Sequence, residues 1–152
     1  MNKIKVACLQ LDVAQDKYQN IENLAEIIAS GAVDGADIIS LPEMWNCPYK
    51  TELFPEYAEP EQGDTWLAMS TLARKSGTYI VGGSIPEDDG GKTYNTCYVF
   101  DREGNQIGKH RKVHLFDIYA HGEQVFKESD TLTGGDSFTT FETEWRTGSP
   151  TW

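Results

Sequence analysis

The spacing of apolar residues near the N-terminus changes from that of a strand to that of a helix and back again. Residues 4–11 (IKVACLQL) form a short and almost continuously apolar run, which is typical of a buried strand. A helical stripe at spacing i, i+3, i+4, i+7 follows, formed by Ile21, Leu24, Ala25 and Ile28. Asp16 or Asn20 can cap its start. Residues 38–41 (IISL) resemble a second buried strand, halted by Pro42. This order predicts two parallel strands with a right-handed helical crossover, and therefore an α/β fold.

The rest of the chain continues this alternation as one domain. Helical spacing returns between a cap at Asp64 and a stop at Gly77. We expect strands at residues 79–85, 95–100 and 106–112, a polar glycine-rich turn at 87–92 and a hairpin loop at 101–105. Residues 113–135 show no clear period and are predicted to form a loop, and residues 138–141 can begin another strand. No internal repeat, linker or low-complexity run divides the sequence.

Charge and cysteine usage exclude several classes of protein. Thirteen Lys and Arg residues against 24 Asp and Glu residues give a net charge of −11, which argues against a nucleic-acid or anionic-membrane partner. No apolar stretch approaches the roughly 20 residues of a membrane span, and no signal-peptide core precedes the first strand. Cys8, Cys47 and Cys97 are odd in number and form no CxxC, so we expect reduced cysteines in a cytoplasmic protein.

Glu43 is the first candidate for chemistry because it lies at the carboxyl end of a predicted parallel strand, where open α/β sheets place their sites. A carboxylate at such a position is partly desolvated and can serve as a general base. The alternative is a solvated glutamate in a strand-to-loop turn. Lys112 closes a later strand in the cluster KHRK at residues 109–112, which by itself is usually a solvated face and less often a phosphate-binding patch.

Together the two segments resemble the carbon–nitrogen hydrolase (nitrilase) superfamily. The similar motifs are LPEMWNCPY around Glu43 and GKHRKVHLFD around Lys112, in order with IKVACLQLD, GADIISLPE, VGGSIPE and YNTCYVFDREGNQIGKHRK. The segments HLFDI and FKES…TLTGGDSF are most similar to the omega-amidase branch. The resemblance covers residues 3–145, which correspond to about the first half of a family member.

The resemblance implies an αββα sandwich, of which this chain would be an incomplete half, and a Glu-Lys-Cys triad. Glu43 matches the general base, Lys112 the cation that stabilises the tetrahedral intermediate, and Glu128 a second glutamate that positions substrate and lysine. The implied reaction releases ammonia from the terminal amide of a small dicarboxylic-acid monoamide and needs no cofactor. Family members commonly associate through the sandwich, so a homo-oligomer is left open. We expect Glu43 and Lys112 to converge, with Glu128 approaching from the long loop.

The family's nucleophilic cysteine is absent. Residues 1–145 match the N-terminal part of the hydrolase domain, whereas residues 146–152 depart from its pattern and contain no cysteine. We therefore expect the 152-residue chain to be inactive alone and its sheet to expose apolar surface. The alternative is a non-catalytic remnant that binds a ligand or associates with other subunits. Cys47 lies near Glu43, but a loop cysteine lacks the oxyanion geometry that a nucleophile needs.

The remaining patterns point to weaker alternatives. An aromatic group near Glu43 can wall a substrate pocket or pack in the core; it comprises Trp45, Tyr49, Phe54 and Tyr57, of which Trp45 and Tyr49 are the pocket candidates. Gly82 and Gly83 follow a strand, but no phosphate-loop motif surrounds them. The spacing of three histidines does not favour a metal site, and none is predicted: His110, His114 and His121.

Overall fold

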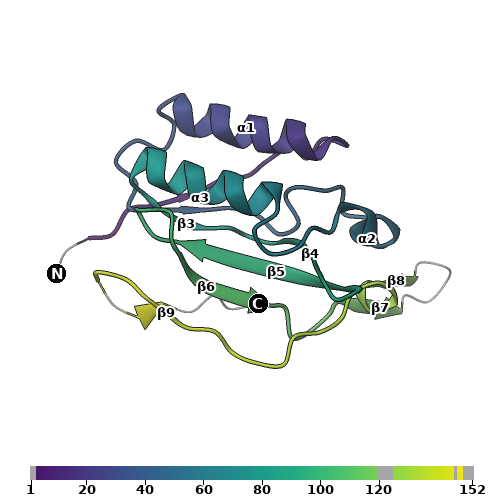
Figure 1. The fold of residues 1–152 in the computed structure, drawn as a ribbon. Coiled ribbons are helices and arrows are strands. Elements are labelled where there is room, and N and C mark those ends of the chain that lie inside the picture. Colours follow the sequence, from purple (N-terminus) through teal and green to yellow (C-terminus); the bar gives the residue numbers. More distant parts are fainter. Residues whose placement is uncertain (1–2, 120–124, 146, 149–152) are drawn as a thin grey trace.

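The computed structural model describes residues 3–119, 125–145 and 147–148. Two long helices, α1 (Lys17–Ala29) and α3 (Asp64–Ser76), lie side by side on one face of a sheet (Figure 1). Between them in sequence are the 3-10 turn η1 (Thr51–Leu53) and the short helix α2 (Phe54–Tyr57). No helix among these residues is long and apolar enough to span a bilayer.

The sheet has six strands and confirms the predicted α/β class. Its order is β1-β2-β3-β5-β4, and β6 also pairs with β5. The strands are β1 (Val6–Cys8), β2 (Ile38–Ser40), β3 (Tyr79–Val81), β4 (Ile85–Asp89), β5 (Lys92–Phe100) and β6 (Gln106–Arg111). The first three are parallel, as the strand–helix–strand pattern predicts, and the pairings of β5 are antiparallel.

The helix ends follow from local chemistry. Asp16 caps α1 by accepting a hydrogen bond from the backbone of Tyr18, whereas Asn20 hydrogen-bonds the backbone of Ala14. The predicted cap of α3 at Asp64 is wrong, because Asp64 is the first helical residue and Gly63 occupies the cap position. The carboxylate of Glu59 instead accepts the backbone N–H of Thr65 in the first turn (2.9 Å).

The core lies between the helices and the sheet, while the opposite face is partly open. Leu24, Ile39 and Ile80 are fully buried on the helix side. On the other face Val6 is 50% exposed and Cys8 is exposed, so the prediction that this first strand is buried on both sides is wrong. The chain leading to β9 (Phe141–Glu142), which pairs with β10 (Thr147–Gly148), passes along that second face (Figure 1).

Two predicted loops contain strands. Residues 87–92 are not a turn: β4 runs through Asp89, and only Gly90 and Gly91, both with positive φ, connect it to β5. The acidic end of β4 conceals the strand, because Asp is rare in strands, and Arg111 on β6 neutralises it by pairing with Asp89. The predicted loop at 113–135 contains the hairpin β7 (Asp117–Tyr119) and β8 (Val125–Lys127), followed by the turn η2 (Glu128–Asp130).

Candidate active site

Glu43 lies in the turn that follows β2. Met44, the next residue, has a φ of 50°, which is unusual for a residue other than glycine. Ser84 holds this turn from across the sheet: its N–H donates to the carbonyl of Pro42 (3.2 Å), and its hydroxyl accepts the N–H of Met44 (3.0 Å). Its carbonyl accepts the N–H of Trp45 (3.3 Å). The position of Glu43 is therefore fixed by a residue some 40 positions downstream.

Gly83 makes that contact between segments sterically feasible. Its φ is +56°, and a Cβ at this position would lie 1.9 Å from the carbonyl oxygen of Pro42. Only a residue without a side chain lets the two backbones approach so closely. The glycine pair after β3 is therefore explained by packing, and not by a phosphate.

Lys112 follows β6 directly, and its ammonium meets both glutamates. Its Nζ lies 2.8 Å from Oε1 of Glu43, and 3.1 and 3.0 Å from Oε1 and Oε2 of Glu128. The predicted convergence of Glu43 and Lys112 is thus confirmed, and Glu128 joins them. Asn95 on β5 completes the cluster, since its Nδ2 donates to Oε1 of Glu43 (2.8 Å) and its backbone carbonyl accepts the N–H of Lys112 (2.8 Å).

Glu128 is fully buried at the start of η2 and is surrounded by donors. Besides Lys112, the backbone N–H of Phe116 donates to Oε2 (2.7 Å), and the hydroxyl of Tyr49 donates to Oε1. A buried carboxylate requires such compensation, because desolvation of an unpaired charge costs several kcal/mol. Glu128 therefore links the hairpin of β7 and β8 to the ammonium of Lys112.

The three charges differ in their access to solvent. The side chain of Glu43 is 33% exposed, that of Lys112 13% and that of Glu128 0%. Burial lowers the pKa of Lys112, but its hydrogen bonds to Glu43 and Glu128 outweigh burial and raise the pKa above its ordinary value. The cluster therefore holds a stabilised cation, one glutamate side chain that solvent reaches and one that is fully buried.

The two aromatic pocket candidates lie in different places. Tyr49 is 42% exposed beside the charges and stacks on Phe126, with a ring separation of 5.8 Å. Burial and the hydrogen bond to Glu128 both raise the pKa of Tyr49, so the phenol stays protonated. Trp45 is fully buried in the helix-side core, where its indole N–H donates to the carbonyl of Gly82 (3.0 Å). The structure brings Tyr49 to the charged cluster but not Trp45.

None of the three cysteines has the surroundings of an activated nucleophile. Cys47 is 1% exposed in a separate apolar cluster, and burial raises its pKa to about 12. Cys97 is buried within β5, and Cys8 lies on the edge strand β1. Cys8 is exposed, because that strand has one open face.

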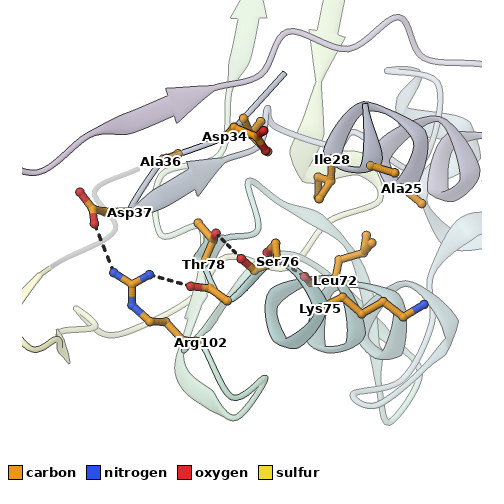
Figure 2. A pocket seen from close by; sticks show the side chains of 14 residues that line it. Ala25, Ile28, Asp34, Ala36, Asp37, Leu72, Lys75, Ser76, Thr78 and Arg102 are labelled. Carbon is orange, nitrogen blue, oxygen red and sulfur yellow. Dashed lines mark hydrogen bonds and ion pairs between the residues drawn. The ribbon is translucent and has the colours of Figure 1, made fainter. Parts of the chain in front are cut away.

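A cavity of about 740 Å³ lies at the other end of β2 from Glu43. The last turns of α1 and α3 and the residues leading into β2 line it (Figure 2). Several of its polar groups are engaged by the protein itself: Arg102 binds Asp37 and the carbonyl of Gly77, and the hydroxyl of Thr78 binds the carbonyl of Ser76 (Figure 2).

Within the described ranges, no group of three or more His, Cys, Asp or Glu side chains is arranged to hold a metal ion. His110 is buried on β6, and its Nδ1 lies 3.3 Å from the hydroxyl of Thr139. Burial lowers its pKa. His114 is exposed, and His121 lies outside the described residues.

The sequence reasoning missed Asn95 and Ser84. Both are 3% exposed and both contact the segment or side chain of Glu43. In the sequence, each is a polar residue within or next to an apolar strand: Asn95 in YNTCYVF and Ser84 in VGGSI. A buried polar side chain needs a partner, so such positions mark contacts even when the partner is unknown.

Comparison with known proteins gives one family. The profile of the family described as Carbon-nitrogen hydrolase matches residues 5–145. The chain is 47% identical over 143 residues to a protein named Omega-amidase NIT2 from Mus musculus and 46% identical to its Homo sapiens namesake, covering 94% of this chain and 52% of each relative. It therefore spans about half the length of these curated relatives.

Solved structures agree. Saccharomyces cerevisiae Nit3, described as a member of branch 10 of the nitrilase superfamily, is 35% identical with a TM-score of 0.82, over 95% of this chain and 53% of Nit3. XC1258 from Xanthomonas campestris, at 19% identity, shares the fold with a TM-score of 0.83, over 99% of this chain and 53% of that protein. The α/β domain is thus a partial version of the nitrilase-superfamily fold, and the chain belongs to the carbon–nitrogen hydrolase family.

Proposed function

We propose that Glu43, Lys112 and Glu128 form the acid–base part of an active site that hydrolyses the C–N bond of a small amide. The observation that carries the proposal is the Lys112 ammonium held within 2.8–3.1 Å of both carboxylates, of which one is reachable and the other buried. A partly exposed carboxylate can act as a general base, and a fixed, mostly buried ammonium can stabilise a developing oxyanion, so this pair supplies two functions that acyl transfer uses.

The roles follow from access and charge. Glu43 is reachable, so it takes the proton of a nucleophile and later gives it to the leaving ammonia. Lys112 stays protonated, so it stabilises negative charge that develops on the carbonyl oxygen. Glu128 is fully buried, so it acts on Lys112 and on the backbone of Phe116 and positions them.

The substrate class rests on the relatives. Their name, omega-amidase, supports a terminal amide of a small dicarboxylic-acid monoamide as the substrate, with ammonia as a product and no cofactor. Tyr49, stacked on Phe126 beside the charges, is the aromatic side chain best placed to line the pocket. We propose this role for Tyr49 and not for Trp45, whose indole lies in the core.

The nucleophile of the proposed reaction is a cysteine outside this chain. We assign residues 1–145 to the N-terminal part of a hydrolase domain and 146–152 to a segment that departs from its pattern. Cys47 is the cysteine nearest in sequence to Glu43, but its thiol with a pKa of about 12 is almost entirely protonated at neutral pH. The 152-residue chain alone is therefore expected to be inactive.

A second candidate is a non-catalytic module that associates with other subunits. The observation favouring it is the open sheet face at β1, where Val6 and Cys8 are exposed. Size-exclusion chromatography with light scattering tests self-association.

We further propose a cytoplasmic setting, supported by the absence of disulfides among the three cysteines, all of which are described.

The deciding experiment measures ammonia release from 2-oxoglutaramate and succinamate. One sample is the 152-residue chain, and the other joins residues 1–145 to the remaining half of the Mus musculus relative. We expect activity in the joined protein alone, reduced about 1,000-fold or more by Glu43→Gln or Lys112→Ala. Glu52→Gln, an exposed carboxylate on η1, is the matched control. Comparable turnover by the short chain that Cys47→Ala abolishes would contradict the proposal.

A further inference from the structure

Asn95 contacts both members of the Glu43–Lys112 pair. Its side-chain nitrogen donates to Glu43 over 2.8 Å, while its backbone carbonyl accepts the N–H of Lys112 over 2.8 Å. The residue is 3% exposed, in β5 between β4 and the end of β6. A single rigid strand position therefore sets the location of the carboxylate and of the backbone that carries the ammonium.

The two oxygens of Glu43 have different surroundings. Oε1 accepts hydrogen bonds from Nζ of Lys112 and from Nδ2 of Asn95. Oε2 receives no hydrogen bond from any residue that the structure describes, although the side chain is one-third exposed. Two donors already occupy the lone pairs of Oε1, so Oε2 is the oxygen with capacity to accept a proton.

We propose that Asn95 is a positioning residue for amide hydrolysis, which fixes Oε1 of Glu43 so that Oε2 carries the proton. This inference rests on the proposed function. The thiol of the nucleophilic cysteine gives its proton to Oε2 as sulfur bonds to the carbonyl carbon. Oε2 passes that proton to nitrogen as the C–N bond breaks and ammonia leaves. A water molecule then gives a proton to Oε2 as its oxygen bonds to the acyl carbon, and Oε2 returns this proton to the departing thiolate.

An amide suits this position better than a charged donor. Lys112 already supplies the positive charge, and a second cation would compete with it for Glu43. An aspartate would instead place a second carboxylate within hydrogen-bonding distance of Glu43 and disfavour its ionised form. A neutral donor orients the carboxylate and leaves the balance of charge to Lys112 and Glu128.

The contact is tested in the 152-residue chain, independently of activity. The side-chain amide protons of Asn95 are followed by ¹⁵N–¹H NMR. A hydrogen bond to a carboxylate is charge-assisted, so Glu43→Gln should move the bonded proton upfield. Glu52→Gln, which removes an exposed carboxylate elsewhere, should leave it unchanged. An Asn95 resonance that is insensitive to Glu43→Gln would overturn the proposal.

The role in catalysis is tested in the joined protein described above. Asn95→Ser should lower kcat about 10- to 100-fold with KM changed less than about 3-fold, because ground-state binding does not require the orientation of Oε2. Asn95→Asp, which keeps the buried volume, should move the acid limb of the pH–kcat profile to higher pH, and Asn23→Asp on α1 should not. A raised KM with unchanged kcat, or an unmoved acid limb, would contradict a positioning role. If the unmodified joined protein hydrolyses no amide, the proposed function itself fails, while the NMR result still decides whether Asn95 holds Glu43.

Discussion

Glu87 should be the most pH-sensitive contributor to the stability of the sheet. It lies on β4, is 1% exposed, and accepts two hydrogen bonds of 2.9 Å from Arg111 and one of 2.7 Å from the hydroxyl of Thr96. Lys109 also pairs with it. Burial raises the pKa of Glu87, but these donors outweigh burial and hold the pKa at about 2, against an ordinary value of 4.5.

The size of the effect follows from these two values. The difference between 4.5 and about 2 corresponds to about 3 kcal/mol of folding free energy. Because the folded-state pKa is the lower one, this stabilisation is complete above about pH 5 and disappears as the pH falls towards 2. Glu87→Gln should therefore cost about 3 kcal/mol at pH 7 and less than half of that at pH 3.

Native-state hydrogen exchange of the β5 amides measures the opening free energy of this part of the sheet. The quantity compared is the difference between the unmodified chain and Glu87→Gln at each pH. Asp89→Asn is the matched control, because Asp89 pairs with the same arginine but its side chain is 60% exposed, so the change should cost less than about 1 kcal/mol. Equal costs for Glu87→Gln at pH 7 and pH 3 would refute the reasoning.

Four further outcomes are expected. Gly83→Ala should destabilise the chain by about 3 kcal/mol or more in urea unfolding, because the added Cβ meets the carbonyl of Pro42. Gly90→Ala, which has a similar φ but open space around it, should cost about 1–2 kcal/mol, and equal costs would argue against the steric explanation. Iodoacetamide at pH 8 should label exposed Cys8 well before Cys47, whose pKa is about 12, as mass spectrometry can read, and equal labelling would contradict the placement of Cys47. Glu128→Gln should lower the pKa of Lys112, which NMR of ¹³C-methylated lysines can measure, and Glu52→Gln should leave that pKa unchanged. An unaltered pKa of Lys112 in Glu128→Gln would mean that Glu128 does not act on it. The open sheet face should bind a hydrophobic dye such as ANS, less so in Val6→Ser, and a dye-free monomer with sharply cooperative urea unfolding would contradict the expected exposure.

The sequence was informative wherever one physical requirement dominated. The apolar period predicted α1 and the parallel strands, because burying one face is the main requirement of those elements. It failed at β4, whose acidic end is stabilised by Arg111 from another strand. It also failed at β7 (DIY) and β8 (VFK), which carry a charged residue and lie in no continuous apolar run, unlike the equally short β1, β2 and β3.

The residues of the candidate site likewise fall into some that the sequence could locate and others that it could not. Glu43 could be located because it follows an apolar strand, and Lys112 because it ends the second strand of a predicted hairpin; the family resemblance indicated Glu128. The contacts of Asn95 and Ser84 could not be predicted, because they depend on the register of β5 against β6 and on the approach of Gly83 to Pro42. Register and close backbone approach are properties of the folded chain that no local pattern encodes.

The three hydrogen bonds of Ser84 to the turn around Glu43 bear on when this site can form in a growing chain. The side-chain hydrogen bonds and ion pairs of Glu43, Lys112 and Glu128 join residues between 43 and 128. The backbone carbonyl of Lys112 also accepts the N–H of Gly135. Domains emerge from the ribosome amino-terminus first, at about 5–20 residues per second. Once the residues up to Gly135 have left the exit tunnel, every segment that makes these contacts is available. The ammonium and its two carboxylates can therefore come together before the residues beyond Gly135 are available to fold against them.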